Sequence, residues 1–403
     1  MKKLFTVLLS VILFNAVNAQ GWQIMNSGGI ATYNYVQFTD ANTGYTGGLF
    51  SSVFKTTDGG VTWNKLNIPG SFGATAIYFT DSQNGYAVGL LGLIIKTTDG
   101  GNTWESHPYQ FLSVLVSVYF PVPDTGYIGG GGGLILKSTN AGRNWYSTVS
   151  GDTNSIYSVY FTNAVTGYAV GGHGTILKTT DGGSTWVHQV SGTTLTFMSV
   201  KFPSKDTGYI AGANTAMEKD TGVILRTTNG GATWVATGAS DTTRYGGLFF
   251  LNARTGYAVG TDGVILQTTD AGAHWNKQKS GVSVGLSSVF FSDNKTGYVV
   301  GGGETILKTT SGGTGIFNPS PVRQLTIIPN PASSRILIKS QQSAPAVQDH
   351  LSFAIYDMCG RDLIRGQVSG AGTMIDIQSL PAGVYYIRLT GDEIPVIGKF
   401  IKE

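Results

Sequence analysis

The sequence predicts an all-β fold, a seven-bladed β-propeller closed by its N-terminal strand and followed by a small Ig-like β-sandwich. Three phrases recur in the same order along most of the chain. They are a short apolar run ending in Phe, the triplet TGY or NGY, and a longer phrase of the form KTTDGGNTW. Successive copies lie 41 residues apart, with one interval of 48. A period of this length is typical of propellers, solenoids and arrays.

Each copy reads as four short strands. The copy at 158–190 contains the apolar stretches SVYF, GYAVG, TILKTT and TWVHQV, separated by turn residues. Val, Ile, Tyr, Thr and Trp favour strands, and no segment of the repeats has a sustained helical period. Four strands in about 40 residues make one propeller blade.

The ends of the repeat region indicate a closed ring. The seventh copy has Ile316 and Phe317 where a Trp is expected, and Trp22 lies 41 residues before Trp63. The N-terminal strand therefore supplies the outer strand of the last blade, which leaves no sheet edge open at the junction. We expect residues 20–318 to form this closed propeller.

The chain ends predict export. Residues 1–19 have the basic start, apolar run and small-residue cleavage site of a secretory signal peptide.

The propeller region carries 16 basic and 16 acidic side chains, a balance that argues against nucleic acid as a partner. One cysteine, Cys359, excludes an internal disulfide. The scattered histidines lack ligand spacing, so we predict no metal and no cofactor.

The C-terminal region is a second domain. Residues 319–325 form a Pro-bearing linker, and residues 326–403 alternate like the strands of a sandwich. The segments IIPNPASSRILI, FAIYDMCGRDL, IDIQSLPAGVYYIRL and GKFIKE resemble the type A C-terminal sorting domain of type IX secretion cargo. The resemblance implies an interaction with the type IX machinery, removal of the tail, and release or attachment to surface lipopolysaccharide. The alternative is an ordinary Ig-like binding module.

The KTTDGGNTW phrase resembles the Asp-box (BNR) repeat, and the complete unit is similar to Ycf48-like propellers, the photosystem II assembly factor type. That resemblance implies a structural role for the box. The chemistry agrees, because Asp or Asn accepts hydrogen bonds from turn N–H groups and Gly allows positive φ. The box residues are Asp58, Asp99, Asn140, Asp181, Asn229 and Asp270, with Ser311 in the worn copy, and Trp63, Trp104, Trp145, Trp186, Trp234 and Trp275. The Lys before most boxes is expected to cover aromatic rings with its stem while its amine stays in water.

Strand order places the boxes and the TGY turns at one end of the blades. A ligand is expected at the other end, where the loops vary. Tyr33, Tyr109, Phe111, Arg244 and Tyr245 are the candidate ligand platform. The insertion between Gly212 and Gly222 lies at the same end, and a tolerated surface loop is the preferred interpretation.

Two functions remain open. The first is a non-enzymatic binding protein, at the cell surface or in the medium, for an unidentified protein or glycan. The second is a glycan-cleaving enzyme, whose two carboxylates would be Asp262 and Glu304 on loops of neighbouring blades. A sialidase-type arginine triad is absent, because only Arg244 is expected at the loop end.

Overall fold

The computed structural model describes residues 21–26, 31–48, 53–69, 74–107, 113–214, 221–237, 243–313, 325–340, 352–357, 361–368, 372–390 and 396–403. The chain forms two compact units, Met1–Ile316 and Phe317–Glu403. The predicted signal peptide, the tip of the insertion and Cys359 lie outside the described residues. Within the described ranges, no helix has the length and apolar character to cross a membrane.

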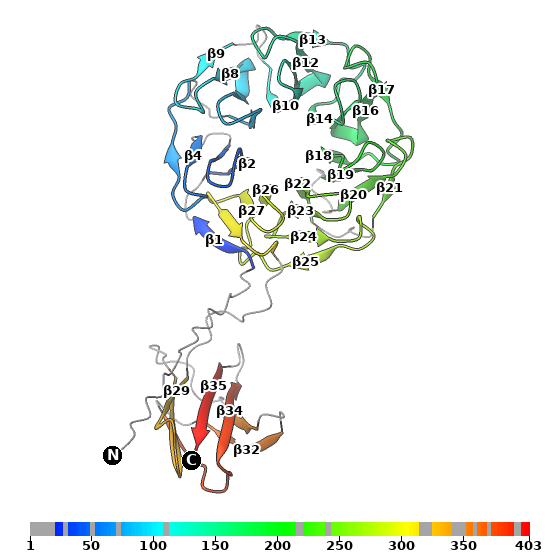
Figure 1. Cartoon of the computed structure of the whole chain (residues 1–403). Helices are drawn as coiled ribbons and strands as arrows, with labels where there is room; N and C mark the ends of the chain where they lie inside the picture. The colour runs from blue at the N-terminus through cyan, green and yellow to red at the C-terminus, as the bar shows by residue number, and fades with distance from the viewer. Residues whose placement is uncertain are drawn as a thin grey trace, which may run out of the picture. The chain divides into compact units, whose positions relative to one another are not determined.

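The first unit is a ring of seven four-stranded antiparallel sheets, as the sequence predicts (Figure 1). Blades one to three are β2 (Tyr35–Phe38), β3 (Gly44–Gly47), β4 (Phe54–Thr56), β5 (Asn64–Lys65); β6 (Ala76–Phe79), β7 (Gly85–Val88), β8 (Ile94–Thr97), β9 (Glu105–Ser106); and β10 (Leu115–Val122), β11 (Thr125–Gly130), β12 (Ile135–Ser138), β13 (Tyr146–Thr148). Blades four to six are β14 (Ile156–Phe161), β15 (Gly167–Gly171), β16 (Ile176–Thr179), β17 (Val187–His188); β18 (Thr196–Lys201), β19 (Gly208–Ala213), β20 (Gly222–Thr227), β21 (Val235–Ala236); and β22 (Tyr245–Phe250), β23 (Gly256–Gly260), β24 (Ile265–Thr268), β25 (Asn276–Gln278).

Blade seven joins the two ends of the ring. It consists of β26 (Leu286–Phe291), β27 (Gly297–Gly301), β28 (Ile306–Thr309) and the N-terminal strand β1 (Gln23–Asn26). β1 pairs antiparallel with β28, which confirms the predicted closure. Trp22 is 8% exposed, meets the ring of Phe291 edge-on, and donates from Nε1 to Gln278 Oε1 at 2.7 Å.

The two ends of the ring differ as the strand order predicts. At one end each Asp box is hydrogen bonded to the first turn of its own blade, as from the N–H of Gly100 to the carbonyl of Gln83. At the other end the loop between the second and third strands contacts the blade-to-blade connection, as from the N–H of Gly172 to the carbonyl of Ser155. The ends are called the box face and the loop face below.

The recurring aromatic residues build the core between blades. In blade one, Tyr45 stacks on Phe79 of blade two with ring centroids 3.8 Å apart, and Phe79 meets Trp104 edge-on. Gly85 must lack a side chain, because a Cβ there would lie 2.5 Å from the Phe79 ring. The same Tyr–Phe stack occurs at all seven junctions. Burial of these large aromatic side chains stabilises the junctions between blades.

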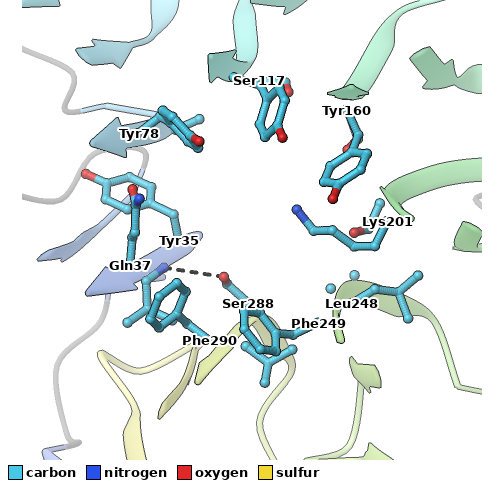
Figure 2. A pocket seen from close by; sticks show the side chains of 18 of the residues that line it. Tyr35, Gln37, Tyr78, Ser117, Tyr160, Lys201, Leu248, Phe249, Ser288 and Phe290 are labelled. Atoms are coloured by element: carbon cyan, nitrogen blue, oxygen red, sulfur yellow. Dashed lines mark hydrogen bonds between the residues drawn. The ribbon is translucent and has the colours of Figure 1, made fainter. Parts of the chain in front are cut away.

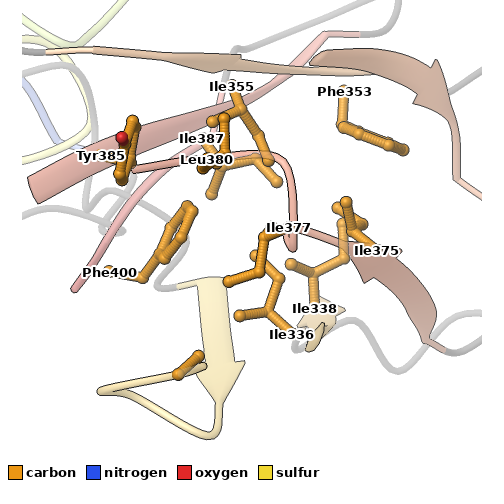
Figure 3. Close-up of a cluster of buried hydrophobic side chains, with 11 residues drawn as sticks. Ile336, Ile338, Phe353, Ile355, Ile375, Ile377, Leu380, Tyr385, Ile387 and Phe400 are labelled. Atoms are coloured by element: carbon orange, nitrogen blue, oxygen red, sulfur yellow. The ribbon is translucent and has the colours of Figure 1, made fainter. Parts of the chain in front are cut away.

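The second unit consists of two sheets that share one core. The sheets are β29 (Leu325–Ile328), β30 (Arg335–Ser340), β33 (Thr373–Asp376); and β32 (Asp362–Gln367), β31 (Ser352–Tyr356), β34 (Gly383–Thr390), β35 (Val396–Lys402). Ile336 and Ile375 of the first sheet pack with Ile355, Ile387 and Phe400 of the second (Figure 3). Alternation of apolar side chains gives each sheet its buried face. The Ig-like topology expected from the sequence stays a prediction.

Candidate binding site: the central channel

The innermost strands of the blades surround a cavity of about 540 Å³. This volume lies within the range of small-ligand sites. Its walls come from β2, β6, β10, β14, β18, β22 and β26, so every blade contributes to it. Figure 2 shows side chains from these strands directed into a common space. We call this cavity the central channel.

One position in each blade sets the character of the channel. It is the residue directly before the repeated Phe. Because successive side chains on a strand point in opposite directions, this side chain points away from the inter-blade core that contains the Phe. Around the ring this position is held by Gln37, Tyr78, Tyr119, Tyr160, Lys201, Phe249 and Phe290. We call these seven side chains the inner ring.

Three tyrosines form one side of the inner ring. The hydroxyls of Tyr78, Tyr119 and Tyr160 each donate to a main-chain carbonyl of the next blade, at 3.2, 3.2 and 3.1 Å. Burial raises the pKa of Tyr78 to about 12 and also raises the pKa of Tyr160. These phenols are therefore neutral at physiological pH, and because each hydroxyl hydrogen is already donated, each oxygen can act toward a ligand only as an acceptor.

Gln37 also binds the main chain of the next blade through its side chain. Its Nε2 donates to the carbonyl of Phe79 at 3.0 Å, and its Oε1 accepts from the N–H of Phe79 at 2.8 Å. Deeper in the wall, the hydroxyl oxygens of Ser117, Ser158 and Ser288 accept from main-chain N–H groups of the next blade at 3.1 to 3.3 Å. These bonds fix the inner strands relative to one another and make the channel wall rigid.

The opposite side of the inner ring is apolar. The rings of Phe249 and Phe290 meet edge-on with centroids 5.3 Å apart. Phe290 also lies 6.2 Å from Phe38. The channel thus has a hydroxyl-bearing wall in blades two to four and an aromatic hydrocarbon wall in blades six and seven.

Lys201 stands between these two walls. Its Nζ lies 5.4 Å from the centroid of the Tyr160 ring. Burial lowers the pKa of Lys201 to about 8, so the ammonium still carries its charge at pH 7. It is the one residue of the channel lining that is charged at that pH, and the lining contains no carboxylate.

The Asp boxes are turn elements in the structure. Asp58 Oδ1 accepts from the N–H groups of Val61 and Thr62 at 3.0 and 2.9 Å, and Oδ2 accepts from the Thr62 hydroxyl. These bonds lower the pKa of Asp58 to about 2, the Thr62 hydroxyl contributing most. Gly59 and Gly60 hold φ of +69° and +84°, which Gly alone adopts without strain. Asn140 Oδ1 accepts the equivalent backbone bond from Asn144 at 3.0 Å.

The box lysines depart from expectation. Their amines were expected to stay in water, but Lys55, Lys96, Lys178 and Lys308 donate from Nζ to a box carbonyl of the next blade at 2.6 to 2.9 Å. The correction has a physical reason. The carbonyl of the residue directly after the box Asp or Asn points toward the neighbouring blade, and as a partly enclosed main-chain acceptor it needs a hydrogen-bond donor.

The candidate platform on the loop face is not assembled as expected. Tyr33 is 2% exposed and meets Phe54 edge-on, and Tyr245 is 1% exposed within the core of blades five and six. Buried rings of this kind offer no surface to a ligand. Arg244 is partly exposed beside them, and Tyr109 and Phe111 lie outside the described residues.

The two candidate carboxylates lie on tight loop-face turns. Asp262 is exposed at φ +56°, and Glu304 is partly exposed at φ +54°. Neither lines the central channel. Within the described ranges, no group of three or more His, Cys, Asp and Glu side chains is arranged to hold a metal ion.

The inner ring was missed by the sequence reasoning. The residue before each repeated Phe changes from blade to blade, so it does not appear as part of the repeat. This position could have been found because it always directly precedes the repeated Phe while its own residue type varies. In a repeat protein, a position that is structurally equivalent in every repeat but varies in residue type is typical of a functional surface.

Two family models match the chain. The model of photosynthesis system II assembly factor YCF48 matches residues 62–154 and 146–242, within the propeller, and that of the secretion system C-terminal sorting domain matches residues 326–403. The propeller repeats are therefore Ycf48-like, and the tail matches a secretion-system sorting domain. This sorting domain supports export of the Ycf48-like protein to the cell surface or the extracellular space.

Solved structures share the fold of this Ycf48-like protein. YCF48 bound to D1 peptide is 18% identical, with TM-score 0.60, over 72% of this chain and 97% of that chain. YCF48 from Cyanidioschyzon merolae is also 18% identical, with TM-score 0.57, over 72% of this chain and 98% of that chain. The GH74 xyloglucanase from Xanthomonas campestris is 13% identical, with TM-score 0.60, over 79% of this chain and 59% of that chain. No curated protein matches the sequence.

Proposed function

We propose that this Ycf48-like protein is an exported, non-enzymatic binding propeller whose central channel receives part of its ligand. The observation that carries the proposal is the composition of the channel wall. Aromatic rings, hydroxyls and one lysine line a cavity of about 540 Å³, and no carboxylate does. Such a surface binds, because apolar faces and a few placed polar groups are what a ligand site needs.

The same observation argues against glycan cleavage in the channel. Glycoside hydrolysis needs two carboxylates that flank the scissile bond. Asp262 and Glu304, the candidates for this role, occupy loop-face turns outside the lining. The likeness to a GH74 xyloglucanase is one of fold, at 13% identity.

The proposed ligand is a segment of another protein. A propeller of the same repeat type has been solved with a peptide, YCF48 bound to D1 peptide. The inner ring suits an extended chain, since side chains can stack on Phe249 and Phe290 while main-chain N–H groups meet the tyrosine oxygens. A glycan remains the alternative ligand class.

The proposed place of action is outside the cell. The sorting tail, residues 326–403, would engage the type IX secretion machinery, and its removal would release the propeller or attach it to lipopolysaccharide. The second unit has its own core, which suits a domain that is recognised and removed as a unit.

Parallel peptide and glycan arrays, with released sugars assayed in the same wells, test the proposal. We expect peptides to bind the full chain, no sugar to be released, and binding to weaken when Phe249→Leu and Phe290→Leu are combined. Lys205→Met is the matched control, because that lysine pairs with Asp206 at the protein surface. Sugar release that vanishes on Asp262→Asn or Glu304→Gln would overturn the proposal.

A further inference from the structure

Lys201 is held differently from Lys205 and from four of the box lysines. Four box lysines donate to main-chain carbonyls, and Lys205 pairs with Asp206 at 2.6 Å. For Lys201, the described residues supply no hydrogen bond or ion pair to Nζ, only the face of Tyr160 at 5.4 Å. Its side chain extends into the channel in Figure 2.

The surroundings of this ammonium do not neutralise it. The ring of Tyr160 faces it from blade four, and the hydroxyl hydrogens of Tyr160 and of its neighbour Tyr119 are already donated to main-chain carbonyls. Phe249 and Leu248 line the channel from blade six, and Phe290 and Ser288 line it from blade seven, and none of these side chains bears a charge. A partly buried charge without a partner is costly, so a built cavity that keeps one has room for an anion.

From this geometry we infer that Lys201 anchors a carboxylate carried on an apolar or aromatic body, which packs against Phe249 and Phe290. The inference deepens the proposed function, on which it rests, by naming the chemistry of the ligand. It extends to an acidic side chain, a chain-terminal carboxylate or a free organic acid, because all three present the same group to the lysine.

A carboxylate fits this site better than a phosphate monoester, which is close to a dianion at neutral pH. A single ammonium balances a single negative charge, whereas a dianion would leave an uncompensated charge in a cavity that has no second cation in its lining. The tyrosine oxygens beside Lys201 act as acceptors, so they give a multiply charged anion no further donors. The aromatic wall across the channel requires the apolar body.

The protonation of Lys201 gives the inference a pH dependence. Burial lowers the pKa of Lys201 to about 8, so its charge is lost above that pH in the empty channel. A bound carboxylate favours the ammonium and raises this pKa. Carboxylate binding should therefore weaken as the pH rises above 8, and binding of a neutral ligand should not.

The test is NMR of the full chain with 13C-labelled lysines and phenylalanines, titrated with phenylacetate and with its neutral partner phenylacetamide at pH 7. The Lys201 Cε signal is assigned by its loss in Lys201→Met, a near-isosteric change that leaves the fold intact. We expect phenylacetate to shift this signal saturably and to raise its titration midpoint, with at least tenfold weaker binding to Lys201→Met. Lys205→Met should bind as the unaltered chain does.

The outcomes separate this inference from the proposed function. An acidic peptide, its amide-capped form and the free acid distinguish the three sources of the carboxylate. If channel-binding peptides shift the rings of Phe249 and Phe290 but no carboxylate moves the Lys201 signal, the inference is overturned and the proposed function stands. If peptides bind the chain and move neither set of signals, both are overturned.

Discussion

The hydroxyl of Tyr298, in the last blade, donates a hydrogen bond of 2.8 Å to the carbonyl of Gly59, in the first blade. The same bond joins every pair of neighbouring blades, from Tyr45, Tyr86, Tyr127, Tyr168, Tyr209, Tyr257 and Tyr298 to a carbonyl in the next Asp box. The box thus has two roles. The Asp or Asn side chain closes a turn, and the carbonyl of the residue after it accepts a hydrogen bond from the tyrosine of the neighbouring blade.

Removing one of these hydroxyls should weaken the ring modestly. Tyr298→Phe keeps the stack on Phe38 and deletes the bond to Gly59, while Lys308 still donates to that carbonyl at 2.6 Å. We expect a loss of about 1 kcal/mol in the free energy of unfolding. The double variant with Lys308→Met should lose more than the sum of its parts, because the carbonyl is then buried without a donor. Urea unfolding measures both.

Tyr146→Phe is the control for this prediction. That tyrosine is 46% exposed and takes no part in a blade junction, so its change should leave the urea midpoint unaltered. A Tyr298→Phe chain as stable as this control would contradict the structural role given to the hydroxyl.

The Asp boxes should make stability depend on acid. Hydrogen bonds from Thr62, Thr103 and Thr185 lower the pKa of Asp58, Asp99 and Asp181 to about 2 in the folded chain, against 3.8 for the ordinary value. A lowered folded pKa contributes stability that is present above pH 4 and is lost as the pH falls toward 2. Replacing the three aspartates with Asn should flatten this part of the profile.

Thermal unfolding between pH 2 and 5 measures the effect. Asn keeps the turn bond, as Asn140 and Asn229 do, so the triple variant should fold normally at pH 7. Asp206→Asn serves as a control on a carboxylate that contacts Lys205 instead of turn N–H groups. An unchanged acid slope in the triple variant would argue against the assignment.

Lys201 should destabilise the empty propeller at neutral pH. Its pKa falls from 10.5 in the unfolded chain to about 8 in the folded chain, so the unfolded state binds more protons between these values. Stability contributed by this group therefore rises as the pH rises from 8 toward 10, by up to about 3 kcal/mol. Lys201→Met should be more stable than the unaltered chain at pH 7 and should lose that rise.

Chemical denaturation at pH 7, 8, 9 and 10 checks this sign. No acidic side chain lines the channel, so no titrating carboxylate there offsets the pH dependence due to Lys201. Tyr78 keeps its proton over this pH range because burial raises its pKa to about 12. Equal pH profiles for the two chains would mean that the lysine is solvated in the empty channel.

The tail should be dispensable for folding and necessary for export. The two compact units have separate cores, so a chain that ends at residue 318 should keep the thermal unfolding transition of the propeller. In a host with the secretion system, this shortened chain should accumulate inside the outer membrane. Immunodetection in cell fractions measures it, and shortened protein in the medium would contradict the role of residues 326–403.

The architecture was predictable because its determinants repeat. The position of Trp22 relative to Trp63 predicted the shared last blade, and the order of strands predicted which turns share a face. The Tyr–box bond was not predictable, because Tyr45 and Gly100 lie 55 residues apart and only the ring brings them together. Both phrases are visible in the sequence, but the hydrogen bond from the tyrosine of one blade to the Asp box of the next is not.

The candidate site was harder to predict, for a local reason. Tyr245 begins an inner strand, but a bulge between Tyr245 and Gly247 shifts the register, and the ring enters the core instead of facing solvent. Alternation alone does not reveal such a shift. Lys201 was overlooked because it replaces a tyrosine or phenylalanine in a position that has no fixed identity.

The binding role of the channel is the central claim, and calorimetric titration of an array-selected peptide tests it most directly. The peptide is titrated into the full chain, into the combined Phe249→Leu and Phe290→Leu variant, and into Lys205→Met. We expect at least tenfold weaker binding to the channel variant and unchanged binding to Lys205→Met. Equal affinity for all three chains would place the ligand elsewhere and contradict the claim.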